Sequence, residues 1–199
     1  DKTAVDFLEN LNNPIYKIAS FEITDIPLIQ YVASKGKPII LSTGIANNED
    51  ISLAINSIKK FNKIKIALLK CTSSYPSPIE DLNLAMIKDF ETRFNVVPGL
   101  SDHSLGITVP IVATALGARI IEKHFILNKS IVSPDSSFSL DEVEFSQMVK
   151  AVRNAETAIG NINYNLTSGQ ESGKNFSRSK NIVKDVKKGE LVTQENIRS

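Results

Sequence analysis

The chain of 199 residues contains two histidines, and each lies among side chains that can bind a metal or take part in catalysis. His103 stands in the stretch LSDHSLGI, directly after Ser101 and Asp102. His124 stands in IIEKHF, two residues after Glu122. Histidine combined with carboxylate or water suits Zn, Mn or Fe. The alternative is a pair of partly buried, hydrogen-bonded histidines, because the spacing matches no compact metal motif such as HExxH.

A second group combines hydroxyls with a lysine. Lys17 and Ser20 belong to YKIAS, Ser42 belongs to ILSTG, and Ser101 belongs to GLSDH. Such side chains, gathered at one site, can hold a phosphate or a carboxylate through charge-assisted hydrogen bonds. Each serine taken alone would equally well cap the helix or turn that follows it. Their recurrence at three segment ends favours an anion-binding site.

Five short apolar segments would position these groups. They are rich in Ile, Leu and Val and alternate little between apolar and polar residues, which is typical of strands covered on both faces of a parallel sheet. The predicted strands cover residues 14–20, 37–43, 63–71, 95–101 and 118–125. Function gathers at the carboxyl ends of such strands, so the polar groups should converge there. Because side chains alternate along a strand, Glu122 and His124 should point to the same side.

Amphipathic segments with helix-capping residues separate the strands. Helices are predicted over residues 24–36, 47–61, 82–94, 106–118 and 140–159. Strands recur every ~25–30 residues, the length of a strand–helix unit, which predicts an α/β fold. An open doubly wound sheet and part of a (β/α)8 TIM barrel both fit. The absence of a glycine-rich dinucleotide fingerprint disfavours the first, and five strands are too few to close the second.

The composition excludes several function classes. Lysine and arginine number 23 against 22 acidic residues, a balance that gives no reason to expect nucleic acid or an anionic membrane as partner. The single cysteine, Cys71, rules out an intrachain disulfide framework, and we expect a reducing, cytoplasmic environment. We expect Cys71 to be a buried, inert thiol, since no base lies near it in sequence. No apolar run approaches the ~18–20 residues that span a bilayer.

The chain changes character after residue 160. Residues 161–178 are polar and rich in Gly, Ser and Asn, which predicts a linker after a first domain over residues 1–160. Residues 179–199 predict two short strands around a turn at KKGE, as at the start of a small β-rich domain. Because five strands cannot close a barrel and no initial methionine is present, we expect a piece of a longer protein.

Six blocks occur in order along the chain: YKIAS, ILSTG, LLKCTSSYPSPIEDLNL, GLSDHSLGI, ALGARIIEKHF and SPDSSFSL. Together they resemble the bacterial sialic acid synthase family, and within it the pseudaminic acid synthases. The family fold is a (β/α)8 barrel followed by a small antifreeze-like (SAF) domain. The resemblance implies that the five strands are barrel strands four to eight, and that residues 179–199 open an incomplete SAF domain.

The resemblance also implies a reaction. Members of the family condense phosphoenolpyruvate with an amino-sugar aldehyde to give a nine-carbon keto acid and phosphate. By motif, phosphoenolpyruvate would be bound by Lys17, Ser20, Ser42 and Ser101. A divalent metal, Mn²⁺ or Mg²⁺, would be bound by His103 and His124. The catalytic candidates are Glu122 and Glu22, and the complete protein is expected to be a homodimer, because the SAF domain covers the partner's active site in the family.

The amino sugar would be contacted by Glu22, Ser73, Tyr75, Asp135 and Phe138. Ser73 follows CT where the N-acetylneuraminate branch often has Asn, and SSFS follows Asp135 where that branch has a stretch similar to HKAS. An apolar wall at Phe138 suits the methyl group of a 6-deoxy sugar, which favours 2,4-diacetamido-2,4,6-trideoxy-altrose and hence pseudaminic acid. Phe138 packed in the core is the alternative.

Two other functions remain open at this stage. One is an N-acetylneuraminate or legionaminate synthase that uses N-acetylmannosamine or a related sugar. The other, from a different class, is a non-catalytic carbohydrate-binding homologue or an inactive fragment. An open barrel would leave unpaired strand edges, so the chain by itself is expected to be less stable than the complete protein.

Overall fold

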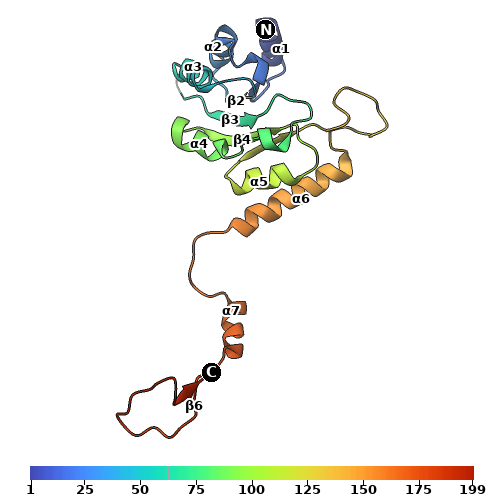
Figure 1. Ribbon diagram of the computed structural model, residues 1–199. Helices are drawn as coiled ribbons and strands as arrows, with labels where there is room; N and C mark the ends of the chain where they lie inside the picture. The colour runs from blue at the N-terminus through green and yellow to red at the C-terminus, as the bar shows by residue number, and fades with distance from the viewer. Residues whose placement is uncertain (62) are drawn as a thin grey trace. The chain divides into compact units, whose positions relative to one another are not determined.

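The computed structural model describes residues 1–61 and 63–199, which divide into two compact units, Asp1–Gly160 and Asn161–Ser199 (Figure 1). The first unit is built around a five-stranded parallel sheet with the strand order β1-β2-β3-β4-β5. The strands are β1 Tyr16–Ile18, β2 Ile39–Ser42, β3 Ile66–Cys71, β4 Val97–Asp102 and β5 Ile120–Lys123. Each lies in a predicted segment, with β4 one residue longer, and the α/β fold is confirmed.

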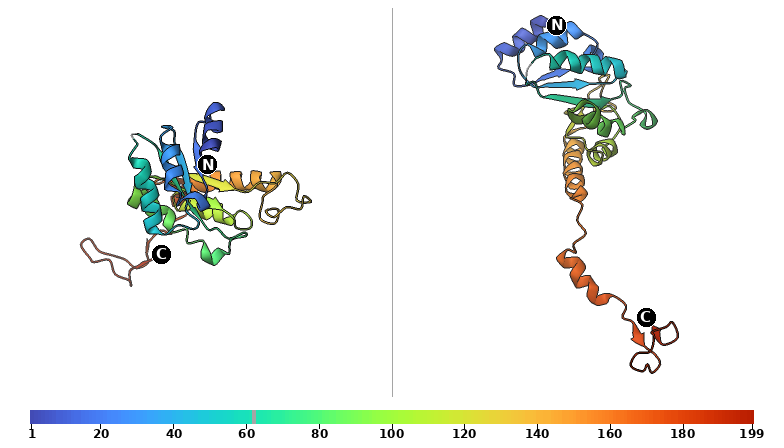
Figure 2. Two further views of the ribbon diagram at one scale, coloured as in Figure 1. Left: turned by 90° about the horizontal axis from the view of Figure 1, so that it is seen from above. Right: turned by 90° about the vertical axis from the view of Figure 1, so that its left-hand side faces the viewer.

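Among the described residues, four helices connect successive strands, one precedes the first strand and one follows the last, and they pack on one face of the sheet (Figure 2). Their bounds are α1 Lys2–Asn10, α2 Ile26–Ala33, α3 Asn48–Lys59, α4 Met86–Phe94, α5 Thr108–Ala115 and α6 Glu142–Ile159. Short 3-10 turns follow β1 at Ser20–Glu22 (η1) and β3 at Ile79–Asp81 (η2). The last five helices lie in the predicted segments, whereas α1 has no counterpart among the predictions. The helices α5 and α6 lie side by side (Figure 1).

Side-chain caps fix where several helices begin. The Asn47 side chain accepts a hydrogen bond from the Asp50 amide at the start of α3, and the Asp50 carboxylate accepts one from the Asn47 amide. Asp141 and Glu144 form the same reciprocal box at α6. These contacts satisfy amides that have no partner within the helix, so the chain leaves each preceding loop at a defined residue.

Alternating side chains divide the sheet into two faces with different roles. The face toward the helices carries most of the apolar core, which includes Tyr16, Ile18, Ile39, Leu41, Leu68, Ile29, Ile55 and Phe90. Burying one large aliphatic side chain contributes about 1.5–3 kcal/mol, so this face supplies much of the stability. By strand register, the opposite face carries Lys17, Ser42, Cys71, Ser101 and Glu122.

The sheet curls strongly toward this second face. Neighbouring strands lie ~4.8 Å apart, so the edge strands β1 and β5 of a flat sheet would be separated by ~19 Å. The Lys17 Nζ of β1 nevertheless lies 3.3 Å from the Glu122 Oε2 of β5. The two side chains can meet only if the sheet is rolled into part of a barrel with these residues on its concave side. The barrel-type fold is therefore confirmed for the first unit.

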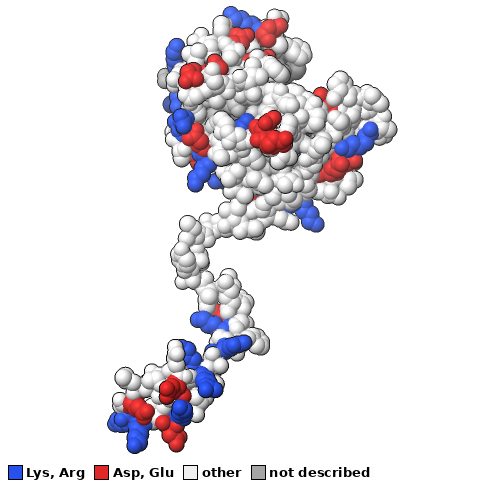
Figure 3. Space-filling model, in the orientation of Figure 1, with Lys and Arg blue, Asp and Glu red and all other residues white. Residues whose placement is uncertain are grey.

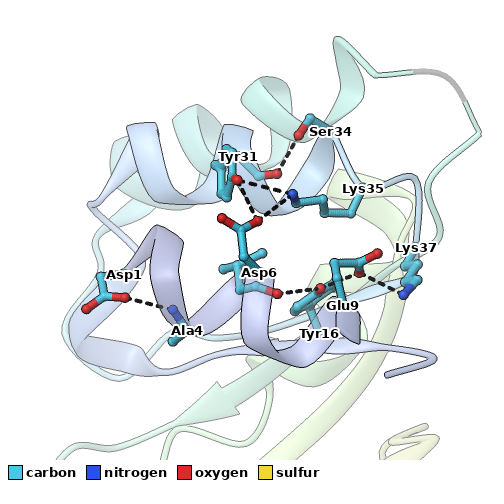
Figure 4. Close-up of polar contacts among 10 residues, drawn as sticks. Asp1, Ala4, Asp6, Glu9, Tyr16, Tyr31, Ser34, Lys35 and Lys37 are labelled. Carbon is cyan, nitrogen blue, oxygen red and sulfur yellow. Dashed lines mark hydrogen bonds and ion pairs between the residues drawn. The ribbon is translucent and has the colours of Figure 1, made fainter. Parts of the chain in front are cut away.

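The helix α1 is held to the sheet and to α2 by two polar clusters (Figure 4). The Asp6 carboxylate accepts hydrogen bonds from the Tyr31 hydroxyl at 2.6 Å and from the Lys35 ammonium at 2.9 Å. One turn later, Glu9 accepts from Lys37 at 2.7 Å and from the Tyr16 hydroxyl. Desolvation and the Glu9 contact raise the pKa of Tyr16 to about 12. These contacts dock a helix that buries only Val5.

The second unit is small and largely exposed. It contains the helix α7 Ser168–Gly173, the 3-10 turn η3 Lys174–Phe176, and the antiparallel strands β6 Asn181–Ile182 and β7 Ile197–Arg198. Two short strands were predicted here, whereas the six-residue helix falls in the predicted linker. Its assignment to an SAF domain stays a prediction.

Charges of both signs are scattered over the face of the molecule seen in Figure 3. This distribution agrees with the net charge of +1. None of the helices in the described part of the chain has the length and apolar character needed to cross a membrane.

Candidate active site

The carboxyl ends of the strands bring together a lysine, a carboxylate and a hydroxyl on the concave face. Glu122 of β5 is the centre of this cluster. Its Oε2 lies 3.3 Å from the Lys17 Nζ, and its Oε1 accepts a hydrogen bond of 2.6 Å from the Ser101 hydroxyl. Lys17 and Glu122 remain partly exposed, so an anion entering from the concave side could reach the ammonium group.

The two other predicted anion-binding serines lie at neighbouring strand ends. The Ser42 side chain at the end of β2 is 1% exposed, and its hydroxyl has no hydrogen-bond partner in the described part of the chain. Ser20 lies just after β1, where its hydroxyl contacts the Cys71 Sγ at 3.1 Å and accepts from the Gly44 amide at 3.2 Å. Buried hydroxyls are normally paired, so the orphaned Ser42 oxygen is a candidate ligand contact.

The two histidines meet beside this cluster. His103 follows β4 and His124 follows β5, and their ring centroids lie 5.1 Å apart with a tilt of 65°. The Nδ1 atom of His103 lies 3.2 Å from the Thr72 carbonyl oxygen. The Nδ1 atom of His124 lies 3.6 Å from a carboxylate oxygen of Asp135. As predicted, the histidines that lie far apart in sequence form one pair in space.

The donor set fits a metal that also binds substrate oxygens or water. A His103 Nδ1–H that donates to the Thr72 carbonyl leaves the lone pair on Nε2, which is the common arrangement of a metal-binding histidine. Within residues 1–61 and 63–199, no group of three or more His, Cys, Asp or Glu side chains is arranged to hold a metal ion. A metal at this site would therefore have His103 and His124 as its candidate protein ligands, with its other ligands supplied by substrate or water.

The environments of the two imidazoles differ. Burial would lower the pKa of His103, but its contacts with Cys71 and with the Thr72 carbonyl outweigh burial and raise it. Burial and the neighbouring His103 lower the pKa of His124. Burial would likewise raise the pKa of the Cys71 thiol, but its hydrogen bonds with His103 and Ser20 outweigh burial and lower it. The protonation of His103 thus affects that of His124, because the two imidazoles lie close together.

Two aromatic side chains pack on the histidines. The Tyr75 ring centroid lies 4.3 Å from that of His103, and the Phe138 centroid lies 4.9 Å from that of His124. Tyr75 is half-exposed, whereas Phe138 is only 2% exposed. Tyr75 can therefore face a ligand, while Phe138 is buried against the imidazoles and Tyr75 and packs as a core residue would.

The remaining predicted residues are Asp135, Ser73 and Glu22, and they differ in whether they reach the histidine pair. Asp135 is exposed and reaches His124, and the Ser73 hydroxyl lies 4.0 Å from the Cys71 Sγ. Glu22 has a local contact instead. Its carboxylate accepts a hydrogen bond of 3.0 Å from the Ala19 amide and caps the 3-10 turn η1. No hydrogen bond or ion pair found among the described residues joins Glu22 to the histidines.

Sequence reasoning missed two members of the site. Cys71 was expected to be inert because no base lies near it in sequence, but in space its Sγ lies 3.8 Å from the His103 Nδ1. The expectation that it is buried is confirmed. Thr72 was not singled out, although its carbonyl orients His103. Strand alternation would have placed Cys71 on the same face as Ser101, its partner in the β3–β4 register.

Comparisons with known proteins give the relatives of this chain. The NeuB family model matches residues 1–164. The chain is 47% identical to a pseudaminic acid synthase of Campylobacter jejuni, over 100% of this chain and 58% of that protein. It is 36% identical to an N,N'-diacetyllegionaminic acid synthase of Legionella pneumophila, over 99% of this chain and 57% of that protein. The chain thus spans under two thirds of these relatives.

A solved structure supports the fold independently. The crystal structure of an N-acetylneuraminic acid synthetase from Leptospira borgpetersenii superposes with a TM-score of 0.81 at 31% sequence identity. The match covers 88% of this chain and 61% of that chain.

Proposed function

Because this chain belongs to the NeuB family, we propose that the protein containing it condenses phosphoenolpyruvate with an amino sugar to give a nonulosonic acid and phosphate. The observation that carries the proposal is the convergence of Lys17, Ser101 and Glu122 beside a histidine pair on the concave face. Phosphoenolpyruvate is a strongly anionic enol ester, so it needs cations and hydrogen-bond donors of this kind.

We assign the anion contacts to the strand ends. The Lys17 ammonium would bind the phosphate or carboxylate of phosphoenolpyruvate, and Glu122 holds this ammonium in place before the substrate arrives. The Ser42 hydroxyl, which has no partner in the described part of the chain, would donate to the same anion. Ser20 and Ser101 are the other proposed contacts, and to donate to the anion their hydroxyls would turn away from the Cys71 Sγ and the Glu122 carboxylate, to which they donate without substrate. Such a site holds its substrate in one orientation.

The sugar would bind next to the histidines. A divalent metal held by His103 and His124, Mn²⁺ or Mg²⁺, would polarise the aldehyde oxygen when bound. C3 of phosphoenolpyruvate forms a bond to the aldehyde carbon, water adds to C2, and phosphate leaves with cleavage of the C2–O bond. Tyr75 would line the sugar side, because it is half-exposed against His103. Glu122 is our candidate for proton transfer.

The proposed sugar is 2,4-diacetamido-2,4,6-trideoxy-altrose, which makes the product pseudaminic acid. The support is the higher identity to the pseudaminic acid synthase, 47%, than to the legionaminic acid synthase, 36%. Phe138 was predicted to form an apolar wall for the sugar methyl group. Its burial gives that prediction little support, so the choice of sugar depends on the identities. Glu22, Ser73 and Asp135 stay proposed sugar contacts.

The test is turnover by the complete protein with phosphoenolpyruvate and each candidate sugar. Phosphate release and product mass should show the altrose derivative as the preferred substrate. Turnover of N-acetylmannosamine alone would refute the pseudaminate assignment. Phosphoenolpyruvate with ¹⁸O in the bridging position should give labelled phosphate, because the C2–O bond breaks.

A pair of matched lysine variants tests the site. Lys17→Ala should abolish turnover, since it removes the ammonium group that faces the substrate. Lys37→Ala is the control, because Lys37 forms a comparable ion pair with Glu9, 2.7 Å long, away from the proposed site. Equal loss of activity in both variants would mean that Lys17 only stabilises the fold.

A further inference from the structure

A buried ion pair lies directly behind the histidine pair. The Lys123 Nζ lies 2.7 Å from the Asp102 Oδ2, and both side chains have 0% exposure. Asp102 ends β4, Lys123 ends β5, and the two residues are direct partners in the β4–β5 register. The same ammonium donates to the carbonyl oxygen of Ser104, and the Ser104 amide donates to the Asp102 Oδ1 at 2.9 Å. The three residues form one closed polar cluster.

This cluster surrounds the residues that carry the histidines. Asp102 and Ser104 stand immediately before and after His103, and Lys123 stands immediately before His124. Because successive side chains point to opposite faces, the ion pair faces the helices while the imidazoles face the site. The Lys123 ammonium therefore binds the residue on each side of His103, through the Asp102 carboxylate and the Ser104 carbonyl oxygen. It links both to the strand that ends just before His124.

Stability alone does not account for a buried ion pair at this position. Removing two charges from water is costly, and apolar residues of similar volume are often as stable or more stable. What the pair does fix is the alignment of the two strands. A slip of one residue between β4 and β5 would turn one histidine away from the site. The pair opposes this slip at the strand ends, where backbone pairing stops.

We propose that Asp102 and Lys123 are positioning residues for the metal-binding histidines, and that they set the separation and tilt of the two imidazoles. The inference rests on one part of the proposed function, the binding of a divalent metal by His103 and His124, and not on the turnover of sugar. Partners that orient metal ligands typically change metal affinity by about 10–100-fold when they are replaced.

The experiment compares the complete protein with the double variant Asp102→Asn, Lys123→Met. The replacements keep side-chain size, leave no buried charge, and retain an oxygen that accepts from the Ser104 amide. The control is Asp89→Asn, Arg93→Met, which neutralises an exposed ion pair on α4. The measurements are the Mn²⁺ dissociation constant by calorimetry and the melting temperature of the metal-free protein.

The expected result is Mn²⁺ binding weakened about 10–100-fold, with the metal-free melting temperature within a few degrees of wild type. The control should match wild type in both measurements. Unchanged Mn²⁺ affinity in the Asp102, Lys123 variant would overturn the inference, whether its melting temperature falls or not. A wild type that binds Mn²⁺ but turns over no sugar would refute the proposed function and leave the inference intact. A wild type that turns over sugar without binding Mn²⁺ would overturn the inference alone.

Discussion

Two adjacent hydroxyls at the end of β2 should respond to removal in opposite ways. Ser42 is buried and its hydroxyl has no partner in the described part of the chain. Thr43 is also buried, but its hydroxyl donates to the Leu69 carbonyl at 3.1 Å and accepts from the Cys71 amide at 3.4 Å. The variants Ser42→Ala and Thr43→Val each delete one hydroxyl and keep a similar volume.

The stability effects follow from hydrogen bonding. An unpaired buried hydroxyl costs about 1–3 kcal/mol, so Ser42→Ala should leave stability unchanged or raise it. Thr43→Val loses formed hydrogen bonds and should cost about 1 kcal/mol. For a protein of this size that cost lowers the melting temperature by about 2–4 °C. Thr43→Val should therefore melt below wild type, whereas Ser42→Ala should not.

For substrate binding, the Ser42 variant should be affected and the Thr43 variant should not. If the Ser42 hydroxyl donates to phosphoenolpyruvate, its loss removes a hydrogen bond to a charged group, worth about 1.5–3 kcal/mol. The KM for phosphoenolpyruvate should then rise by about 10–150-fold. Thr43→Val should leave this KM unchanged, because the Thr43 hydroxyl is already engaged by the protein.

The assay combines thermal unfolding with initial-rate kinetics at varied phosphoenolpyruvate, using the complete protein. A less stable Ser42→Ala variant with an unchanged KM would refute the reasoning, since it would show that the hydroxyl has a structural partner. A Thr43→Val variant with a raised KM would refute the assignment of the ligand contact to Ser42 alone.

Three other predictions follow from single contacts. Glu122→Gln should lower kcat at least tenfold with little change in melting temperature, because the side chain is partly exposed; wild-type kcat would exclude a catalytic role. Gly44→Ala should raise the KM for both substrates, because the new Cβ would lie 2.0 Å from the Ser73 hydroxyl and 2.8 Å from the Ser20 hydroxyl and displace both; an unchanged KM for the sugar would contradict the proposed Ser73 contact. Hydrogen bonds from Lys37, which has the larger effect, and from Tyr16 hold the pKa of Glu9 below its ordinary value of 4.5. Its contribution to stability is therefore present above that value and is lost as the pH falls through the folded-state pKa. Glu9→Gln should flatten the acid side of a melting-temperature profile, and a profile parallel to wild type would contradict the contact.

Much of the fold could be predicted because its signals are local. Continuous runs such as KPIILST reflect strands covered on both faces, and caps such as Asn47 reflect unpaired amides at a helix start. The helix α1 was not predicted. It buries a single residue, Val5, and depends on contacts of Asp6 and Glu9 with residues more distant in sequence.

The site was predictable where topology decides it and not where packing does. Parallel strands bring their carboxyl ends together, which is why Ser101, His103 and His124 could be grouped from sequence. The approach of Cys71 to His103 depends on the register of β3 against β4. The burial of Phe138 depends on the path of the loop after β5, which returns to the sheet by pairing Leu140 with Phe125. The register of two strands and the path of a loop are set by packing, and no local pattern in the sequence specifies them.

The alternation along β4 has a consequence for how such a protein can evolve. Leu100 faces the helices, while its neighbour Ser101 and then His103 face the concave side. Selection for a folded chain and selection for a particular chemistry therefore act on interleaved positions of one strand. A deep mutational scan read out by abundance should tolerate substitutions at Ser101 and His103 better than at Leu100, whereas a scan read out by product should tolerate them at none of the three positions. The concave-side positions can thus change under one kind of selection while the helix-facing core stays constant.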